Sequence, residues 1–252
     1  MSGVELSHAG ATDVGLVRTH NEDAHLVAPP VFVVADGMGG HQGGDVASGI
    51  VVEEFAALAG FAGNLAEGAA AMTAALESCQ RRILEYAAQQ GAAGPGQWYA
   101  GTTVTAALLV EGADPPCWLV MNLGDSRCYR FHDGVLVQVS TDHSVVQELI
   151  DAGLISEAEA VVHPERHVIT KALGGPHLAS PDFFELSLAE AERLLLCSDG
   201  INGLLADDEI AAVLAEHRDP VAAADRVVAA ALAAGGSDNA TAVVVDVVGW
   251  PT

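Results

Sequence analysis

The stretch VFVVADG, residues 31–37, is an apolar run that ends on an aspartate and a glycine. Two later stretches share this design: WLVMNLGDS at residues 118–126 and LLLCSDG at residues 194–200. A fourth aspartate, Asp238, stands just before the apolar run AVVVDVV at residues 242–248. Short apolar runs bounded by turn residues are typical of buried strands. The four carboxylates are therefore expected where strands leave the core.

Carboxylates that converge in one cleft raise one another's pKa unless positive charge lies between them. Hard divalent cations, bound through oxygen ligands, are the usual source of that charge. Taken singly, the Asp-Gly pairs at residues 36–37 and 199–200 would be ordinary turn dipeptides, as the pair at 133–134 is expected to be. The apolar runs that precede the first two pairs favour a metal site instead.

The composition predicts one acidic, globular domain over residues 1–252. Half of the residues are hydrophobic, which suits a substantial core, and no repeat or linker divides the chain. The chain has 34 acidic and 10 basic residues, which gives a formal net charge of −24. A surface of this charge disfavours nucleic acid and anionic membranes as partners. It also repels phosphate-bearing ligands, so such a ligand needs local positive charge.

The spacing of the cysteines and the length of the apolar segments exclude several further classes of protein. Cys79, Cys117, Cys128 and Cys197 form no C-x-x-C pair, and none is followed six positions later by arginine. Zinc, thioredoxin-like and cysteine-phosphatase sites are therefore not expected. Buried, reduced thiols in a cytoplasmic protein are expected instead. The chain shows neither a signal-peptide pattern nor an apolar run of about 18 residues, so no membrane span is predicted.

The order of the expected elements favours an α+β fold with antiparallel sheets over a βαβ repeat. Strand groups alternate with helix pairs along the chain. Strands are expected within residues 11–36, at 101–110, 117–124, on both sides of 133–134, at 182–186, 193–197 and 240–248. Helices are expected after the glycine-rich turn 37–44, at 65–90, within 145–174, at 207–217 and at 220–234.

The glycine segment GMGGHQGG, residues 37–44, raises the alternative of a nucleotide-binding regulatory domain. Its glycines miss the pattern G-x-G-x-x-G because residue 42 is glutamine, and no G-K-[ST] follows. Neither a Rossmann motif nor a P-loop is therefore indicated. Binding of ATP or GTP would be the observation that favours this alternative.

Six sequence blocks follow one another along the chain: GLVRTHNEDA (15–24), ADGMGGHQGGDVAS (35–48), GTT (101–103), NLGDSRCYRFHDGVLVQVSTDHS (122–144), LLLCSDG (194–200) and SDNATAVVV (237–245). Together, in this order, they resemble the metal-dependent protein serine/threonine phosphatases of the PP2C (PPM) family in its bacterial form. The resemblance implies a four-layer α-β-β-α sandwich, in which helix pairs flank two antiparallel sheets. It also implies metals in a cleft at one edge.

The resemblance further implies a ligand set for two Mn²⁺ or Mg²⁺ ions. Asp36 resembles the carboxylate that bridges the two ions, and the adjacent Gly37 offers its backbone carbonyl. Asp199 and Asp238 resemble the remaining ligands of the pair. All of these are oxygen donors, which suits Mn²⁺ or Mg²⁺ better than zinc.

Two more aspartates are implied by the resemblance. Asp23 resembles a ligand that acts largely through bound water. Asp125 resembles the residue that, together with Asp199, holds a third and weaker ion in bacterial members.

Arg18 and His41 are the implied catalytic residues. Arg18 falls where the family places its phosphate-binding arginine, and one guanidinium can bind a phosphate bidentately. His41 is the candidate general acid that protonates the departing serine or threonine oxygen. The alternative for His41 is a hydrogen bond to local backbone or metal-bound water. His20, His25 and His143 are expected to be structural.

The implied reaction is direct hydrolysis of phosphoserine and phosphothreonine in proteins by a metal-activated water, reversing a bacterial Ser/Thr kinase. Residues 145–171 correspond to the flap of bacterial members, and a monomer is the default. The main alternative is a catalytically silent scaffold that binds phosphoproteins. Such relatives usually lose a metal carboxylate, whereas Asp36, Asp199 and Asp238 are all present.

Overall fold

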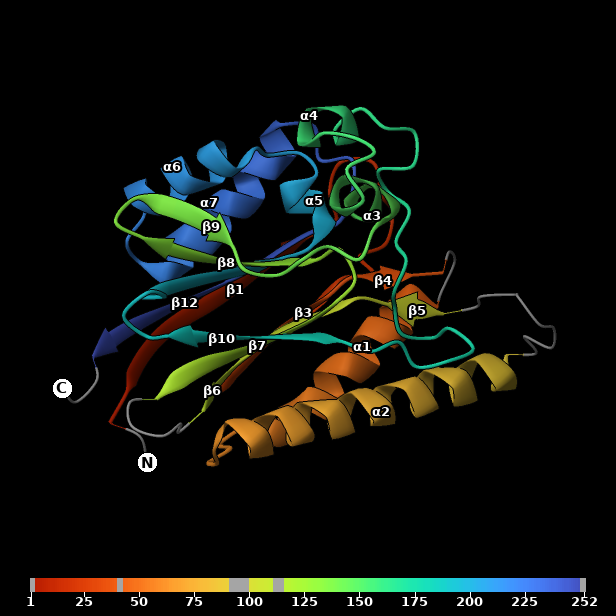
Figure 1. The fold of residues 1–252 in the computed structure, drawn as a ribbon, viewed down its shortest axis with the longest axis horizontal. Coiled ribbons are helices and arrows are strands. Elements are labelled where there is room, and N and C mark those ends of the chain that lie inside the picture. The colour runs from red at the N-terminus through yellow and green to blue at the C-terminus, as the bar shows by residue number, and fades with distance from the viewer. Residues whose placement is uncertain (1–2, 40–42, 91–99, 111–115, 250–252) are drawn as a thin grey trace.

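Two antiparallel sheets packed face to face form the centre of the molecule (Figure 1). The computed structural model describes residues 3–39, 43–90, 100–110 and 116–249. Helices cover the outer face of each sheet, so that four layers result (Figure 1). The α+β sandwich expected from the sequence is confirmed.

The strands divide evenly between the two large sheets, and every hydrogen-bonded pair is antiparallel. The first sheet contains, in spatial order, β1 (Glu5–Asp13), β12 (Ala240–Gly249), β11 (Arg193–Cys197), β8 (Arg127–His132) and β9 (Val135–Gln138). The second contains β10 (Asp182–Ser187), β7 (Cys117–Leu123), β6 (Val104–Val110), β3 (Val31–Ala35) and β2 (Ala24–Ala28). A small third sheet pairs β4 (Gly37–Met38) with β5 (Gly101–Thr102).

One helix pair covers the second sheet: α1 (Gly44–Phe55) and α2 (Leu65–Gln89). A capping box starts α2, because Asn64 accepts from the N–H of Glu67 and Glu67 accepts from the N–H of Asn64. The short 3-10 helix η1 (Ala56–Leu58) follows α1.

The other pair, α6 (Asp207–Glu216) and α7 (Pro220–Ala233), lies on the first sheet (Figure 1). Asp219 caps α7, whose first residue is proline, as helix starts favour. A one-turn helix, α5 (Asp199–Asn202), follows β11 directly.

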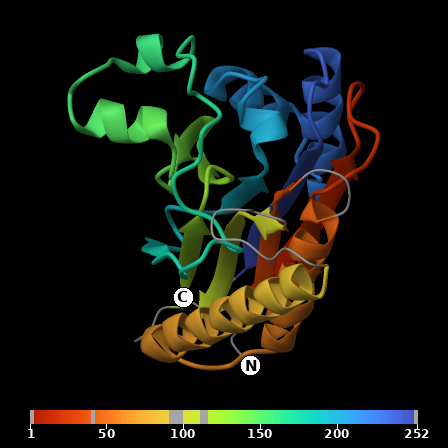
Figure 2. The same cartoon turned by 90° about the vertical axis from the view of Figure 1, so that its right-hand side faces the viewer.

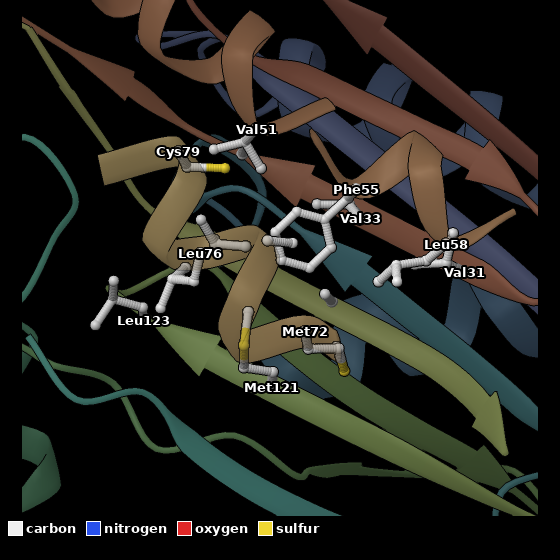
Figure 3. Close-up of a cluster of buried hydrophobic side chains, with 14 of the residues drawn as sticks. Val31, Val33, Val51, Phe55, Leu58, Met72, Leu76, Cys79, Met121 and Leu123 are labelled. Carbon is white, nitrogen blue, oxygen red and sulfur yellow. The ribbon is translucent and has the colours of Figure 1, made fainter. Parts of the chain in front are cut away.

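Apolar side chains that point to alternate faces of the buried strands pack into three hydrophobic cores. On β3, Val31 and Val33 face the helix pair, where Figure 3 shows Val33 beside Phe55 and Val31 beside Leu58. Phe32 and Val34, one residue out of step, pack between the two sheets. A third core lies between the first sheet and α6 and α7. Successive side chains of a strand point to opposite faces, so a strand buried on both faces is apolar throughout.

The strand register brings the expected site residues to one edge of the sandwich. Asp36 follows β3, and Asp23 precedes its neighbour β2, whose Ala24 pairs with Ala35. Asp199 follows β11, and Asp238 stands two residues before its neighbour β12. In antiparallel neighbours the end of one strand lies beside the start of the next. The edge therefore collects residues that are far apart in sequence.

The segment 145–174 differs from the expectation of a mainly helical stretch. It contains only α3 (Val145–Asp151) and α4 (Glu157–Ala160), joined and followed by irregular chain. Figure 2 shows this segment, in green, reaching out beside the sheets. Over the described ranges, no helix has both the length and the apolar character needed to cross a bilayer.

Candidate metal and phosphate site

Five aspartates from five different turns meet at this edge of the sandwich. Asp36 is hydrogen-bonded to Asp199, and the charges of Asp23 and Asp125 also act on it. The negative charge of Asp238 in turn raises the pKa of Asp199. The structure thus brings together all five carboxylates that the sequence singled out.

The environment disfavours the charged form of these groups. Desolvation by burial is the main cause that raises the pKa of Asp23 to about 7, and the charges of Asp199 and Asp238 add to it. Hydrogen bonds with Ser198 and Thr241 lower this pKa and offset part of the effect. Desolvation and the charge of Asp199 raise the pKa of Asp125 to about 8. Desolvation likewise raises the pKa of Asp36 and of Asp199. Each side chain nevertheless keeps some accessible surface, as expected for groups at the bottom of a cleft.

Two threonines of the GTT block hold the backbone of Asp36. The N–H of Asp36 donates to Oγ1 of Thr103 (3.0 Å), and its carbonyl accepts from the N–H of Thr103 (2.9 Å) and from Oγ1 of Thr102 (2.9 Å). Oγ1 of Thr103 also pairs with Oγ of Ser126 (2.8 Å), beside Asp125. One hydroxyl therefore links the turn that carries Asp36 to the turn that carries Asp125.

Two glycines at the site are required by close packing. A Cβ at Gly200 would lie 1.8 Å from the carbonyl oxygen of Asn239. Gly124 has φ +120°, and a Cβ there would lie 2.5 Å from Cγ2 of Thr103. Larger residues would push apart the turns that carry the carboxylates.

Arg18 lies beside the carboxylates on a loop that Asn239 ties down. Its Nη2 donates to Oδ2 of Asp238 (2.7 Å), while 53% of its side chain remains exposed. The amide of Asn239 donates to the carbonyls of Val14 and His20 (both 2.9 Å) and accepts from the N–H of Glu22 (2.8 Å). The loop is thereby closed onto the start of β12.

Asp23 is surrounded by hydroxyl groups. Oγ of Ser198 donates to its Oδ2 (2.7 Å), and the N–H of Thr241 donates to Oγ of Ser198 (3.0 Å). A carboxylate held in this way has lone pairs left to accept from water, which suits the expected role of Asp23.

The donor set fits a hard divalent ion. Within the described residues, no group of three or more His, Cys, Asp or Glu side chains is placed so that it could hold a metal ion by itself. Asp23 accepts from Ser198, Asp238 accepts from Arg18 on Oδ2 and from the N–H of Asn239 on Oδ1, and Asp36 is hydrogen-bonded to Asp199. Mg²⁺ usually keeps several waters and needs only one or two carboxylates. Desolvated, mutually repelling carboxylates that form no such group are therefore compatible with an ion that binds partly through water.

Of the two remaining predicted site residues, Gly37 is among the described residues and His41 is not. Gly37, in β4, donates its N–H to the carbonyl of Glu22 (3.2 Å) and directly follows Asp36. His41 lies outside the described residues, so its role as general acid stays a prediction.

A cavity of about 580 Å³ adjoins the carboxylates. Its walls include Asp125 and Asp199 from the site and, from the segment 145–171, Val146, Ile150 and His167. The segment that the sequence assigned to a flap therefore borders the same space as the site.

Sequence reasoning missed the residues that position the carboxylates: Thr102, Thr103, Ser126, Ser198 and Asn239. All lie within or beside the quoted blocks, and all are small polar residues at the ends of apolar runs. That placement was the available signal, because a polar side chain buried at a strand end needs partners.

Comparison with known proteins assigns the family. The model of the family described as protein phosphatase 2C matches residues 17–234, and the chain belongs to this family. The serine/threonine protein phosphatase PstP of Mycobacterium tuberculosis is 38% identical over 245 residues, covering 97% of this chain and 46% of PstP. The serine/threonine phosphatase stp of Listeria monocytogenes is 33% identical over 249 residues, covering 93% of each chain. The chain thus spans about half the length of PstP but nearly all of stp.

Solved structures agree with this assignment. A crystal structure of M. tuberculosis PstP/Ppp has a TM-score of 0.84 at 35% identity, covering 97% of this chain and 99% of that one. Staphylococcus aureus Stp1 gives 0.85 at 31% identity, covering 98% and 97%. The catalytic domain of PstP in complex with two manganese ions gives 0.79 at 36% identity, covering 98% and 99%.

The hydroxyl of Thr103 provides a first test of how the site is held. Thr103→Val removes the acceptor of the Asp36 N–H, so we expect a loss of about 1–3 kcal/mol in the free energy of unfolding and weaker Mn²⁺ binding. The matched control is Thr105→Val on β6, two residues further along the chain, because Oγ1 of Thr105 has no hydrogen-bond partner among the described residues. Urea unfolding and calorimetry measure both effects. Equal losses in the two variants would contradict the assignment.

The raised pKa values predict how stability depends on pH when metal is removed. The pKa values of Asp23 (about 7) and Asp125 (about 8) exceed the ordinary value of 3.8. Between these limits the folded chain binds more protons than the unfolded chain, so its stability falls as pH rises.

In chelator we therefore expect Tm to fall by more than about 5 °C from about pH 6 to about pH 8.5. Mn²⁺ should reduce this fall because it compensates the charge, and Asp125→Asn should make it shallower. Differential scanning calorimetry measures it, and an equal fall with and without Mn²⁺ would contradict the prediction.

Proposed function

We propose that this chain hydrolyses phosphoserine and phosphothreonine esters in proteins with the aid of divalent cations. The observation that carries the proposal is the meeting of five carboxylates and one accessible arginine at a single edge of a protein phosphatase 2C fold. The relatives named above are serine/threonine protein phosphatases, which supports the same substrate class here.

We assign the roles of the residues from the family resemblance, and their common position at one edge of the sandwich supports the assignment. Asp36, Asp199, Asp238 and the carbonyl of Gly37 would hold two ions, and Asp125 with Asp199 a third. When bound, the ions supply Lewis acidity that activates water and neutralises phosphate charge. Mn²⁺ and Mg²⁺ both suit an all-oxygen site, and PstP, a relative, has been solved with two manganese ions.

Arg18 is the proposed phosphate-binding residue. A guanidinium has five N–H donors in a rigid fork, and the hydrogen bond to Asp238 uses Nη2 of Arg18. Its remaining donors, on a half-exposed side chain, can bind two phosphoryl oxygens. In a chain with a net charge of −24, this local positive charge would be needed to capture the anion.

The wider setting is proposed on chemical grounds. The four cysteines are free and buried, which suits a reducing compartment such as the cytoplasm. We infer a monomer that acts on phosphoproteins and reverses a cognate Ser/Thr kinase.

Loss of Asp36 tests the proposed function directly. Asp36→Asn is expected to lower Mn²⁺-dependent hydrolysis of p-nitrophenyl phosphate and of phosphothreonine peptides by at least about 10²-fold, because the negative charge of a carboxylate that would hold the ions is removed. The matched control is Asp219→Asn at the start of α7, where aspartate and asparagine cap equally well. Wild-type protein that binds a phosphopeptide but turns over neither substrate with any metal would indicate the scaffold instead.

The role of His41 can be tested by leaving-group dependence. His41→Ala is expected to lower kcat about 10²-fold or more for phosphothreonine peptides, whose alkoxide leaving group needs protonation. The loss should be much smaller for p-nitrophenyl phosphate, which releases a stable anion. Steady-state kinetics measure both, and equal losses on the two substrates would contradict a general-acid role.

A further inference from the structure

His143 has an unusual set of partners for a residue that the proposed reaction does not use. It lies two residues before α3 and the segment 145–171, separated from them by the N-cap Ser144, and only 6% of its side chain is exposed. Every polar atom of this residue has a partner within 3.1 Å. Those partners belong to three different parts of the chain.

The first partner is the turn that carries Asp125. The N–H of Gly124 donates to Nδ1 of His143 (3.0 Å), and the N–H of His143 donates to the carbonyl of Gly124 (2.9 Å). Nδ2 of Asn122 donates to the same carbonyl (3.0 Å). Both the N–H and the carbonyl of Gly124, the residue immediately before Asp125, are therefore hydrogen-bonded.

The second partner set fixes the ring. Because Nδ1 accepts a hydrogen bond, the neutral ring carries its proton on Nε2, which donates to Oδ2 of Asp182 (3.1 Å). Lys171, the one lysine in the sequence, places Nζ 3.0 Å from Nε2 and 3.6 Å from Oδ1 of Asp182. Since Nζ and the Nε2–H are both donors, both are directed at Asp182. A second proton, on Nδ1, would face the Gly124 N–H and lose that bond.

The third partner is the far end of the segment 145–171. The N–H of Thr170 donates to the carbonyl of His143 (2.8 Å), and the N–H of Val145 donates to the carbonyl of Val168 (2.9 Å). Ser144 and Ile169 form an isolated bridge between them. The two ends of the segment are thus joined at the residue that also holds Gly124.

We propose that His143 is a positioning residue that locks the turn 124–126, and with it Asp125, to both ends of the segment 145–171. The ring accepts from the turn, the backbone carbonyl accepts from the returning chain, and Asp182, which is also paired with Lys171, accepts from the ring. Movement of the segment and placement of the Asp125 carboxylate are thereby coupled. The link to metal binding rests on the proposed function, whereas the mechanical link does not.

Hydrogen exchange in the metal-free protein tests the mechanical link. In His143→Leu, the Gly124 N–H loses its acceptor Nδ1, so we expect its amide to exchange about tenfold faster, as loss of one buried hydrogen bond implies. The Thr170 N–H keeps the backbone carbonyl of residue 143 as acceptor, but we expect its amide to exchange faster too because the residue that carries this carbonyl is no longer fixed by its ring, while β12 amides keep their rates. The control is the same change at His132, the last residue of β8 and the end of that strand away from the turn 124–126, and His132→Leu should leave both amides unchanged. Because His143→Leu could unfold the chain, Asp182→Leu provides a second route. It removes the acceptor of Nε2 at a residue that is 41% exposed, and it should accelerate the same two amides.

Mn²⁺ titration by calorimetry tests the link to the site. The weakest Mn²⁺-binding step, identified by its loss in Asp125→Asn, should weaken about tenfold in His143→Leu and in Asp182→Leu. Asp182→Asn, which keeps an acceptor for Nε2, should restore affinity close to that of the wild type. Unchanged exchange at either amide in both variants overturns the proposed lock. Altered exchange with unchanged Mn²⁺ affinity overturns its coupling to Asp125, and absence of all Mn²⁺ binding in the wild type instead overturns the proposed function.

Discussion

Mutual repulsion among buried carboxylates is the constraint on which this structure depends. Asp36 and Asp199 are hydrogen-bonded to each other, and desolvation together with neighbouring charge raises the pKa of both. Such an arrangement costs stability in the absence of positive charge. It persists because each aspartate sits on a turn fixed by the sheets, whose cores are packed on both faces. The energy stored in this repulsion favours cation binding, and a bound cation in turn favours a phosphate.

Short polar side chains provide the precision that the sheets alone do not. The hydroxyl of Thr103 bridges the turns of Asp36 and Asp125, and Asn239 closes the loop of Arg18 onto β12. His143 extends this pattern to the segment 145–171. Each of these groups is buried and makes more than one hydrogen bond, so it fixes relative positions rather than adding a single contact. Placement of a reactive site to within a fraction of an ångström requires such support.

Charge acts on two scales in this molecule. The overall charge of −24 keeps phosphate-bearing molecules at a distance, and Arg18 offers a local exception at the edge of the sandwich. The same arginine neutralises part of Asp238 through a 2.7 Å ion pair. Its position is therefore stabilised by the carboxylates that a metal would bind, and the guanidinium is already oriented toward the site before a ligand arrives.

The sequence by itself determined the fold class, the family blocks and the identity of the acidic residues, because apolar runs ending in Asp-Gly mark buried strands and their exits. It also identified most strand and helix positions, although β1 begins at Glu5 rather than near residue 11, and residues 145–174 are less helical than their composition indicates. Only the tertiary structure decided which turns meet. The pairing of β2 with β3 and of β11 with β12 sets the turns within each sheet, and the packing of the two sheets then brings the turn of Asp23 to those of Asp199 and Asp238, roughly 200 positions away in the sequence. The partners of Thr103, Asn239 and His143 likewise depend on contacts distant in sequence, which no local pattern encodes.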